Sequence, residues 1–200
     1  LALALNRLRE QVAELGEGLD QQIEGLTEEA GSLAARVADL NARIMVAEGR
    51  SRGDAAGLRD QRDAVLRDLG TLVDVTVREQ PNGVVNVYIG NEALVQGGLS
   101  RGLSTQARVV DGYKRTSVVF TDSGSVIAPR GGRIAGLMAA RDEHAFSRLA
   151  ELDEFAGALI AEVNRVHADG QGLAGFTELE GTTRLTRTDA VLNTDEAGLG

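Results

Sequence analysis

The sequence predicts an α+β fold: an elongated antiparallel bundle of two long helices and one short helix, into which an antiparallel β region is inserted. Two observations lead to this fold class. Apolar residues recur at helical spacing near both ends of the chain, over 5–44 and 145–166. Between them, short alternating apolar runs are separated by turn sequences. Because neither long apolar stripe can be buried alone, we expect the two to pack against each other, with the β unit at one end or side.

The first long helix is predicted from Leu5 to Ile44. Its apolar residues recur every seven positions, at Leu5, Val12, Leu19, Leu26, Leu33 and Leu40, and each has an apolar companion three or four positions later. The pattern is typical of an ordinary bundle helix and equally of a coiled coil. Four glycines interrupt it, namely Gly16, Gly18, Gly25 and Gly31. Each costs up to about 1 kcal/mol relative to Ala, so packing has to compensate.

A short helix is predicted over about 55–69, after a break at 49–57 in which Asp54 can serve as the helix cap. Its apolar stripe consists of Leu58, Val65, Leu66, Leu69 and Leu72. The opposite face, in "LRDQRDAVLRDLG", is densely charged. Arg59 and Asp63 are four positions apart, as are Asp63 and Arg67, a spacing that contributes ~0.2–0.5 kcal/mol per pair. We interpret the cluster as a charged helix face, with Arg62 as an alternative bridge to the long helix.

The β region is predicted at about 73–129. A first strand, "VDVTVRE", would place Val73, Val75 and Val77 on one face and turn back through "QPNG" into "VVNVYIG". Further short strands are expected at "QARVV", "TSVVF" and "SVIAP". The intervening sequences "GGLSRG", "DGYK" and "DSGS" are typical of turns.

The second long helix is predicted to begin near Arg133 and to end in "HADGQG", where Gly170 can adopt a left-handed conformation. Its stripe consists of Ala145, Leu149, Leu152, Ala156, Leu159, Val163 and Val166, widened by Phe155 and Ile160. We therefore place a helical domain at 1–175 and expect 176–200 to be the start of a further β-rich domain or a frayed tail.

The composition excludes several classes of function. The formal net charge is -9, and the 21 basic residues are interleaved with acids. This argues against a nucleic-acid partner, which needs a basic surface, and against attraction to an anionic membrane. No apolar run approaches the ~20 residues needed to span a bilayer. Because the chain has no cysteine, disulfides, thiolate metal sites and cysteine nucleophiles are excluded.

The two histidines do not form a metal or catalytic site with each other. His144 and His167 lie on the same predicted helix, roughly 35 Å apart along its axis. His167, in the last turn, is expected to meet the free carbonyl groups of the helix end.

Acidic residues and a glycine-rich stretch offer two further candidates. Asp20, Glu24, Glu28 and Glu29 could suggest paired carboxylates, but on a helix face they are expected to be solvated charges. "GGRIAG" at 131–136 lacks the Lys and Ser/Thr of a phosphate-binding loop, and helix initiation explains it.

An enzyme site within the β region is another hypothesis. The triplet Asp111, Tyr113 and Lys114 could be part of such a site, but a turn explains it more simply. The sequence therefore predicts no catalytic, cofactor-binding or metal-ligating residue, and no cofactor.

A family resemblance rests on several stretches taken together. "SLAARVADLNARI", "LRDQRDAVLRDLGTLVDVTV" and "GVVNVYIGNEALVQGG", followed by "GGRIAGLMAARD" and "LDEFAGALIAEVNRVHADG", resemble the flagellar hook-associated protein 1 family over about 1–175. The resemblance implies a structural, non-enzymatic subunit exported through the flagellar type III apparatus without a cleaved signal peptide. It would be extracellular and would assemble as a ring of copies between hook and filament.

The resemblance also implies partners. These would be other copies of the same chain, the hook protein, the next hook-associated protein, and an export chaperone that binds regions expected to lie outside this sequence. We expect the sequence to be an internal fragment that lacks the family's terminal polymerisation regions. The alternative, from another class, is a coiled-coil adaptor or scaffold that dimerises through the 5–44 helix.

Overall fold

The computed structural model describes residues 1–50, 55–110 and 113–169. The predictions for Asp54, Asp111, Gly170 and 176–200 lie outside these residues. The chain divides into two units, Leu1–Ala156 and Gly157–Gly200. The core and the contacts between elements described below belong to the first unit.

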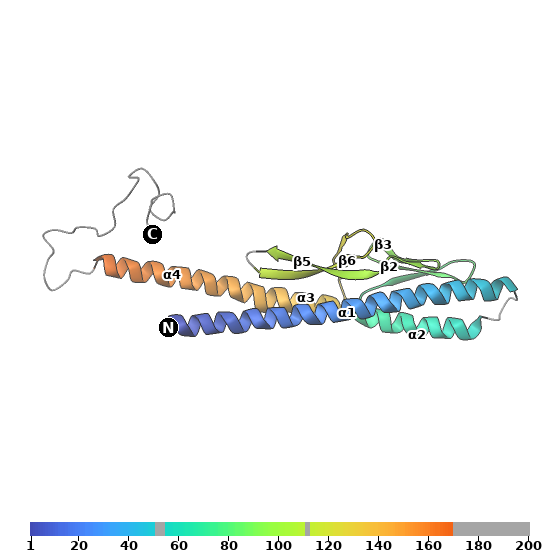
Figure 1. The fold of residues 1–200 in the computed structure, drawn as a ribbon, viewed down its shortest axis with the longest axis horizontal. Coiled ribbons are helices and arrows are strands. Elements are labelled where there is room, and N and C mark those ends of the chain that lie inside the picture. Colours follow the sequence, from blue (N-terminus) through green and yellow to red (C-terminus); the bar gives the residue numbers. More distant parts are fainter. Residues whose placement is uncertain (51–54, 111–112, 170–200) are drawn as a thin grey trace, which may run out of the picture. The chain divides into compact units, whose positions relative to one another are not determined.

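Two helices open the chain. α1 spans Ala2–Arg50 and α2 spans Ala56–Leu72, and Figure 1 shows α2 lying alongside the C-terminal half of α1. Both exist where the sequence predicts them, and α1 extends beyond the predicted ends. The N-cap residue of α2 is Ala55, which makes no side-chain capping bond. Arg59 near the start of α2 pairs with Glu48 near the end of α1, which shows that the two helices are antiparallel.

Within the described residues, seven strands follow and form two antiparallel sheets. The first sheet contains β1 (Thr76–Glu79), β2 (Val85–Ile89), β3 (Glu92–Gln96) and β4 (Leu99–Ser100) in that order. The second contains β5 (Leu103–Val110), β6 (Tyr113–Phe120) and β7 (Val126–Ile127). Figure 1 shows the strands beside α1.

Part of the first sheet was not predicted from the sequence. The strand predicted from Val73 begins at Thr76, because the N–H of Val73 donates to the carbonyl of Leu69 and closes α2. β3 was not predicted, and β4 lies within the predicted turn "GGLSRG". β3 is only five residues long, and Gly90 and Gly97 flank it with φ of 57° and 60°. Because both glycines are typical of turns, the residues between them were not recognised as a strand.

The buried face of α1 coincides only in part with the predicted stripe. The apolar companions Ile23, Ala30, Val37 and Ile44 are buried as predicted, and so is Leu40, whereas Leu19, Leu26 and Leu33 are only partly buried. The buried residues step mainly by four and three along the helix: Gly16, Asp20, Ile23, Thr27, Ala30, Ala34, Val37, Asn41 and Ile44, with Ala38 and Leu40 beside them. Many of them are small, and small side chains allow a sheet to approach the helix closely. At Gly31, for example, a Cβ atom would lie 3.0 Å from the carbonyl oxygen of Leu103 in β5.

One hydrophobic cluster joins this face of α1 to the other elements. It includes Ile23, Val37 and Leu40 of α1, Leu69 and Leu72 of α2, Val87 and Leu94 of the first sheet, Val118 and Phe120 of the second, and Ile134. The sheets and the helices therefore share a single core.

Within the first unit, the second helical run is antiparallel to α1, as predicted, but it is not one uninterrupted α-helix. It consists of α3 (Gly132–Ala140), a π-helical segment η1 (Arg141–Phe146) and α4 (Ser147–Asp169). Its apolar stripe is fully buried as far as Leu149, whereas Phe155 is 53% exposed. Near the start of α1, Leu3 and Leu8 are also exposed. The predicted mutual burial of the two long helices is therefore only partial.

The glycines of α1 allow a matched test of this packing. Gly25 and Gly31 are both helical, but a Cβ at Gly25 would meet nothing within 4 Å. We expect Gly25→Ala to raise the free energy of unfolding by up to about 1 kcal/mol, because only helix propensity changes. Gly31→Ala should be destabilising, because the new methyl group pushes against the backbone of β5. Urea unfolding followed by circular dichroism measures both, and equal stabilisation by the two substitutions would contradict the packing.

Candidate functional site

A buried polar cluster joins α1, β6 and the π-helical segment. The backbone N–H of Thr116 in β6 donates to both carboxylate oxygens of Asp20, at 3.3 Å each. Nη1 of Arg141 donates to Oδ1 of Asp20 and to the backbone carbonyl of Thr116, at 2.6 Å each. All three residues are at least 95% buried. The charges of Asp20 and Arg141 are therefore paired in the interior.

The reason for this cluster lies in the pairing of β6. The short strand β7 pairs with β6 only at Val118 and Val119. Thr116 lies beyond that pairing, and its backbone groups still need partners because unpaired buried N–H and C=O groups are costly. The Asp20 carboxylate accepts from the N–H and the Arg141 guanidinium donates to the C=O. Together they cap the open edge of β6 as a neighbouring strand would.

Asn41 makes the equivalent contact to the first sheet. Its side-chain nitrogen donates to the carbonyl oxygen of Val85 in β2, at 2.7 Å, and its side-chain oxygen accepts from the N–H of Val85. The same nitrogen also donates to the carbonyl oxygen of Gly97. Asp20 and Asn41 lie on the same face of α1, three heptads apart. Each sheet is therefore joined to α1 by one polar side chain that satisfies strand backbone.

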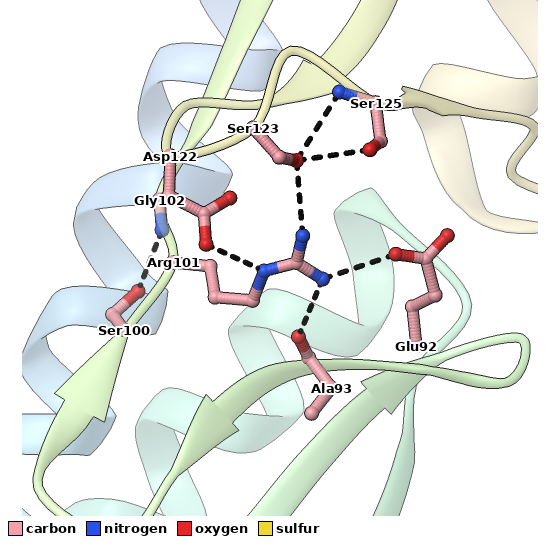
Figure 2. Close-up of polar contacts among 8 residues, drawn as sticks. All are labelled: Glu92, Ala93, Ser100, Arg101, Gly102, Asp122, Ser123 and Ser125. Carbon is pink, nitrogen blue, oxygen red and sulfur yellow. Dashed lines mark hydrogen bonds and ion pairs between the residues drawn. The ribbon is translucent and has the colours of Figure 1, made fainter.

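Arg101 joins the two sheets to each other (Figure 2). It lies between β4 and β5, and its Nε donates to Asp122 at 2.8 Å. Its two terminal nitrogens donate to Glu92, to the carbonyl oxygen of Ala93 and to Ser123. Four of the five N–H donors of a guanidinium are thus used within the fold. The hydrogen bond from Arg101 holds the pKa of Asp122 below its usual value.

The charged cluster of α2 differs in detail from the predicted pattern. Arg59 pairs with Glu48 of α1 and not with Asp63. Arg62 is buried, and it donates to the carbonyl oxygen of Gly83 in the turn before β2 and not to the long helix. The cluster therefore contributes contacts between elements as well as a solvated face.

The acidic candidates of α1 divide into two groups. Glu28 and Glu29 are exposed, as predicted. The prediction is wrong for Asp20, which is buried, and for Glu24, which is half-buried and accepts from the hydroxyl of Thr116. The spacing could have indicated that Asp20 is buried, because it lies three positions before Ile23, within the four-and-three series of buried residues.

The histidine and tyrosine candidates do not form a reactive site. His167 Nδ1 lies 3.2 Å from the carbonyl oxygen of Val163, one turn back within α4, and this is not the predicted contact with the free carbonyl groups of the helix end. His144 is exposed in the π-helical segment. Tyr113 donates to Asp153, and burial raises the pKa of its phenol, with that hydrogen bond as a further cause. Lys114 is exposed.

A groove of about 660 Å³ lies where the α1–α2 end meets the β1–β2 turn. Its lining includes Met45, Glu48, Arg59, Pro81 and Asn82. Glu48 and Arg59 pair with each other across it, and none of these five side chains is a nucleophile activated by a neighbouring base. Within 1–50, 55–110 and 113–169, no group of three His, Cys, Asp or Glu residues is placed to hold a metal ion. Over the same ranges, no helix is both long and apolar enough to cross a bilayer.

Comparison with known proteins gives the family. Residues 1–181 match the family model of the flagellar hook-associated protein FlgK helical domain. This chain belongs to the FlgK family. Its sequence is 28% identical over 151 residues to flagellar hook-associated protein 1 of Escherichia coli (strain K12), covering 72% of this chain and 27% of that protein. It is 29% identical over 150 residues to the protein of the same name from Salmonella typhimurium, covering 71% and 27%.

A solved structure agrees with the FlgK assignment. The flagellar hook junction protein FlgK from Burkholderia pseudomallei matches with a TM-score of 0.60 and 27% identity, over 70% of this chain and 26% of that one. The α+β architecture is therefore that of the FlgK family. The chain spans about a quarter of the length of the relatives it matches.

The buried cluster yields a stability prediction. In Asp20→Ala the guanidinium of Arg141 stays buried without its counter-ion, and the N–H of Thr116 loses its acceptor. We expect the free energy of unfolding to fall by about 3–5 kcal/mol. The matched control is Glu28→Ala on the exposed face of the same helix, which should change it by no more than about 0.5 kcal/mol. Chemical denaturation measures both, and similar small effects would show that the cluster adds nothing to the fold.

Proposed function

We propose that this chain is part of a structural subunit of the bacterial flagellum, located at the junction between hook and filament, and that it performs no catalysis. Membership of the FlgK family and the names of its relatives support the location. The observation that carries the structural role is the use of the buried ionic groups. Asp20 and Arg141 pair with each other and with strand backbone, which stabilises the joints between elements.

The same proposal includes partners and location. The subunit would assemble with other copies of itself in a ring and contact the hook protein and the next hook-associated protein. Its export chaperone would bind regions beyond this sequence. It would be extracellular, secreted through the flagellar type III apparatus without a cleaved signal peptide, and it would bind neither nucleic acid nor a membrane. An acidic net charge of -9 is consistent with the last two points.

We further propose that the helical domain extends over 1–175 and that 176–200 is the start of a further β-rich domain or a frayed tail. The family match over 1–181 supports a boundary close to this position.

The adaptor alternative is not favoured. A dimer formed through the 5–44 helix needs its apolar stripe at the surface. From Ile23 to Ile44, however, the inward face of α1 is buried against α2, α3 and the strands of the same chain. A surface already occupied within one molecule cannot also serve as a coiled-coil seam.

Deletion of the encoding gene tests the proposed function. We expect cells with hooks that carry no attached filament, and flagellin released into the growth medium, because the filament would lack its point of attachment. Electron microscopy of hooks and immunoblotting of the medium measure the two effects.

Complementation is the control for that experiment. The intact gene on a plasmid should restore filaments, and so should a gene carrying Glu28→Ala, which changes only an exposed side chain. Normal filaments in the deletion strain would contradict the proposal.

A further inference from the structure

The π-helical segment η1 lies at a change in the spacing of buried residues. Ile134 and Arg141 are seven positions apart, as are Leu149 and Ala156, but Arg141 and Leu149 are eight apart. Ile134, Arg141 and Leu149 are all buried. The second helical run therefore contains one residue more than a regular heptad pattern allows, and the excess falls between Arg141 and Leu149.

An uninterrupted α-helix would rotate Leu149 relative to Arg141. Eight α-helical residues turn by about 800°, which overshoots two full turns by about 80°. Leu149 would then lie at the edge of the face that carries Ile134 and Arg141 instead of at its centre. A π turn accommodates one additional residue, so that eight residues complete about two turns. Figure 1 accordingly shows α3 and the start of α4 running together along α1.

Contacts at the start of η1, within it and after it show that the helix stays in phase. At its first residue, Arg141 donates to Asp20. Within it, a Cβ on Gly16 would lie 3.3 Å from the Cβ of Ala145. After it, Asp153 accepts from Nε of Arg9 at 3.0 Å. These partners on α1 follow in reverse order, as an antiparallel pair in continuous register requires.

We propose that Arg141–Phe146 is a one-residue register joint, in which the π turn accommodates the excess residue and Arg141, anchored to Asp20 and Thr116, holds it in place. π turns are rare because the α form is favoured, so tertiary contacts must hold one. Arg141 provides them from the first position of the segment. The excess residue does not pack against α1, because the three residues after Arg141, namely Asp142, Glu143 and His144, are all exposed.

Removal of the excess residue is the direct test. Deletion of Glu143 should convert the segment into a regular α-helix and leave both flanking faces on α1. Gly16→Cys and Ala145→Cys, introduced together into a chain that has no other cysteine, report the register, because their Cβ separation is close to that of a disulfide. We expect this disulfide to form to the same extent with and without Glu143, and the thermal midpoint to be unchanged or higher.

Deletion of Glu151 is the matched control, because it removes an exposed Glu from α4, where there is no excess residue. It should turn Asp153 away from Arg9, return the lowered pKa of the Asp153 carboxyl to its usual value, and lower the thermal midpoint by more than about 4 °C. Carbon-13 NMR follows that pKa. If deletion of Glu143 prevents folding, abolishes the disulfide, or lowers the midpoint as much as the control, the register joint is refuted.

A second variant tests Arg141 as a positioning residue. Arg141→Met should reduce formation of the engineered disulfide between positions 16 and 145 several-fold in the parent sequence, because an unanchored π turn relaxes toward the α form. In the chain without Glu143 it should leave the disulfide unchanged, because the α-helix is already in register. Arg141→Met leaves Asp20 unpaired with or without Glu143, so the effect of the unpaired carboxylate cancels when the two losses of disulfide are compared. Equal losses in the two backgrounds would contradict the positioning role.

Discussion

The buried face of α1 is the surface on which α2, α3, the π-helical segment and strands of both sheets pack. α1 carries four glycines within its heptad pattern, and a helix of that composition is not stable in water without packing. The two sheets depend on α1 in turn. Their strands β4 and β7 have two residues each, and small isolated sheets are only marginally stable in water. Because residues of α1, α2, α3, β2, β3, β5, β6 and β7 share one hydrophobic cluster, helix and sheets must form together.

Strands of unequal length leave some backbone N–H and C=O groups without a partner strand. Polar side chains of the helices satisfy these groups. Asp20 with Arg141 satisfies the backbone of Thr116, and Asn41 satisfies that of Val85. Small residues between them allow the close approach that these bonds require. The use of buried polar side chains to satisfy strand backbone suits a protein of the FlgK family whose task we propose to be mechanical.

Local patterns were enough to predict α1, α2 and most of the strands, because heptad spacing and turn residues act within a few positions. They failed where the outcome depends on distant partners. Asp20 resembles a solvated helix acid until Thr116 and Arg141 are known to face it. β3 has no alternating pattern, because its two buried residues, Leu94 and Val95, are adjacent. The π turn has no unambiguous signal in the sequence, because the eight-residue spacing of Arg141 and Leu149 also separates the buried Ala30 and Ala38 of the regular helix α1.

Native-state hydrogen exchange as a function of denaturant tests the dependence on α1 most directly. If the buried face of α1 organises the unit, the amides of Ile23–Ile44 will exchange with the free energy of global unfolding. Those of Leu69 in α2 and Val118 in β6 will share that free energy, because none of these elements persists without the others. Amides of α2 or of either sheet that stay protected after those of Ile23–Ile44 have exchanged would show an independent core and contradict this account.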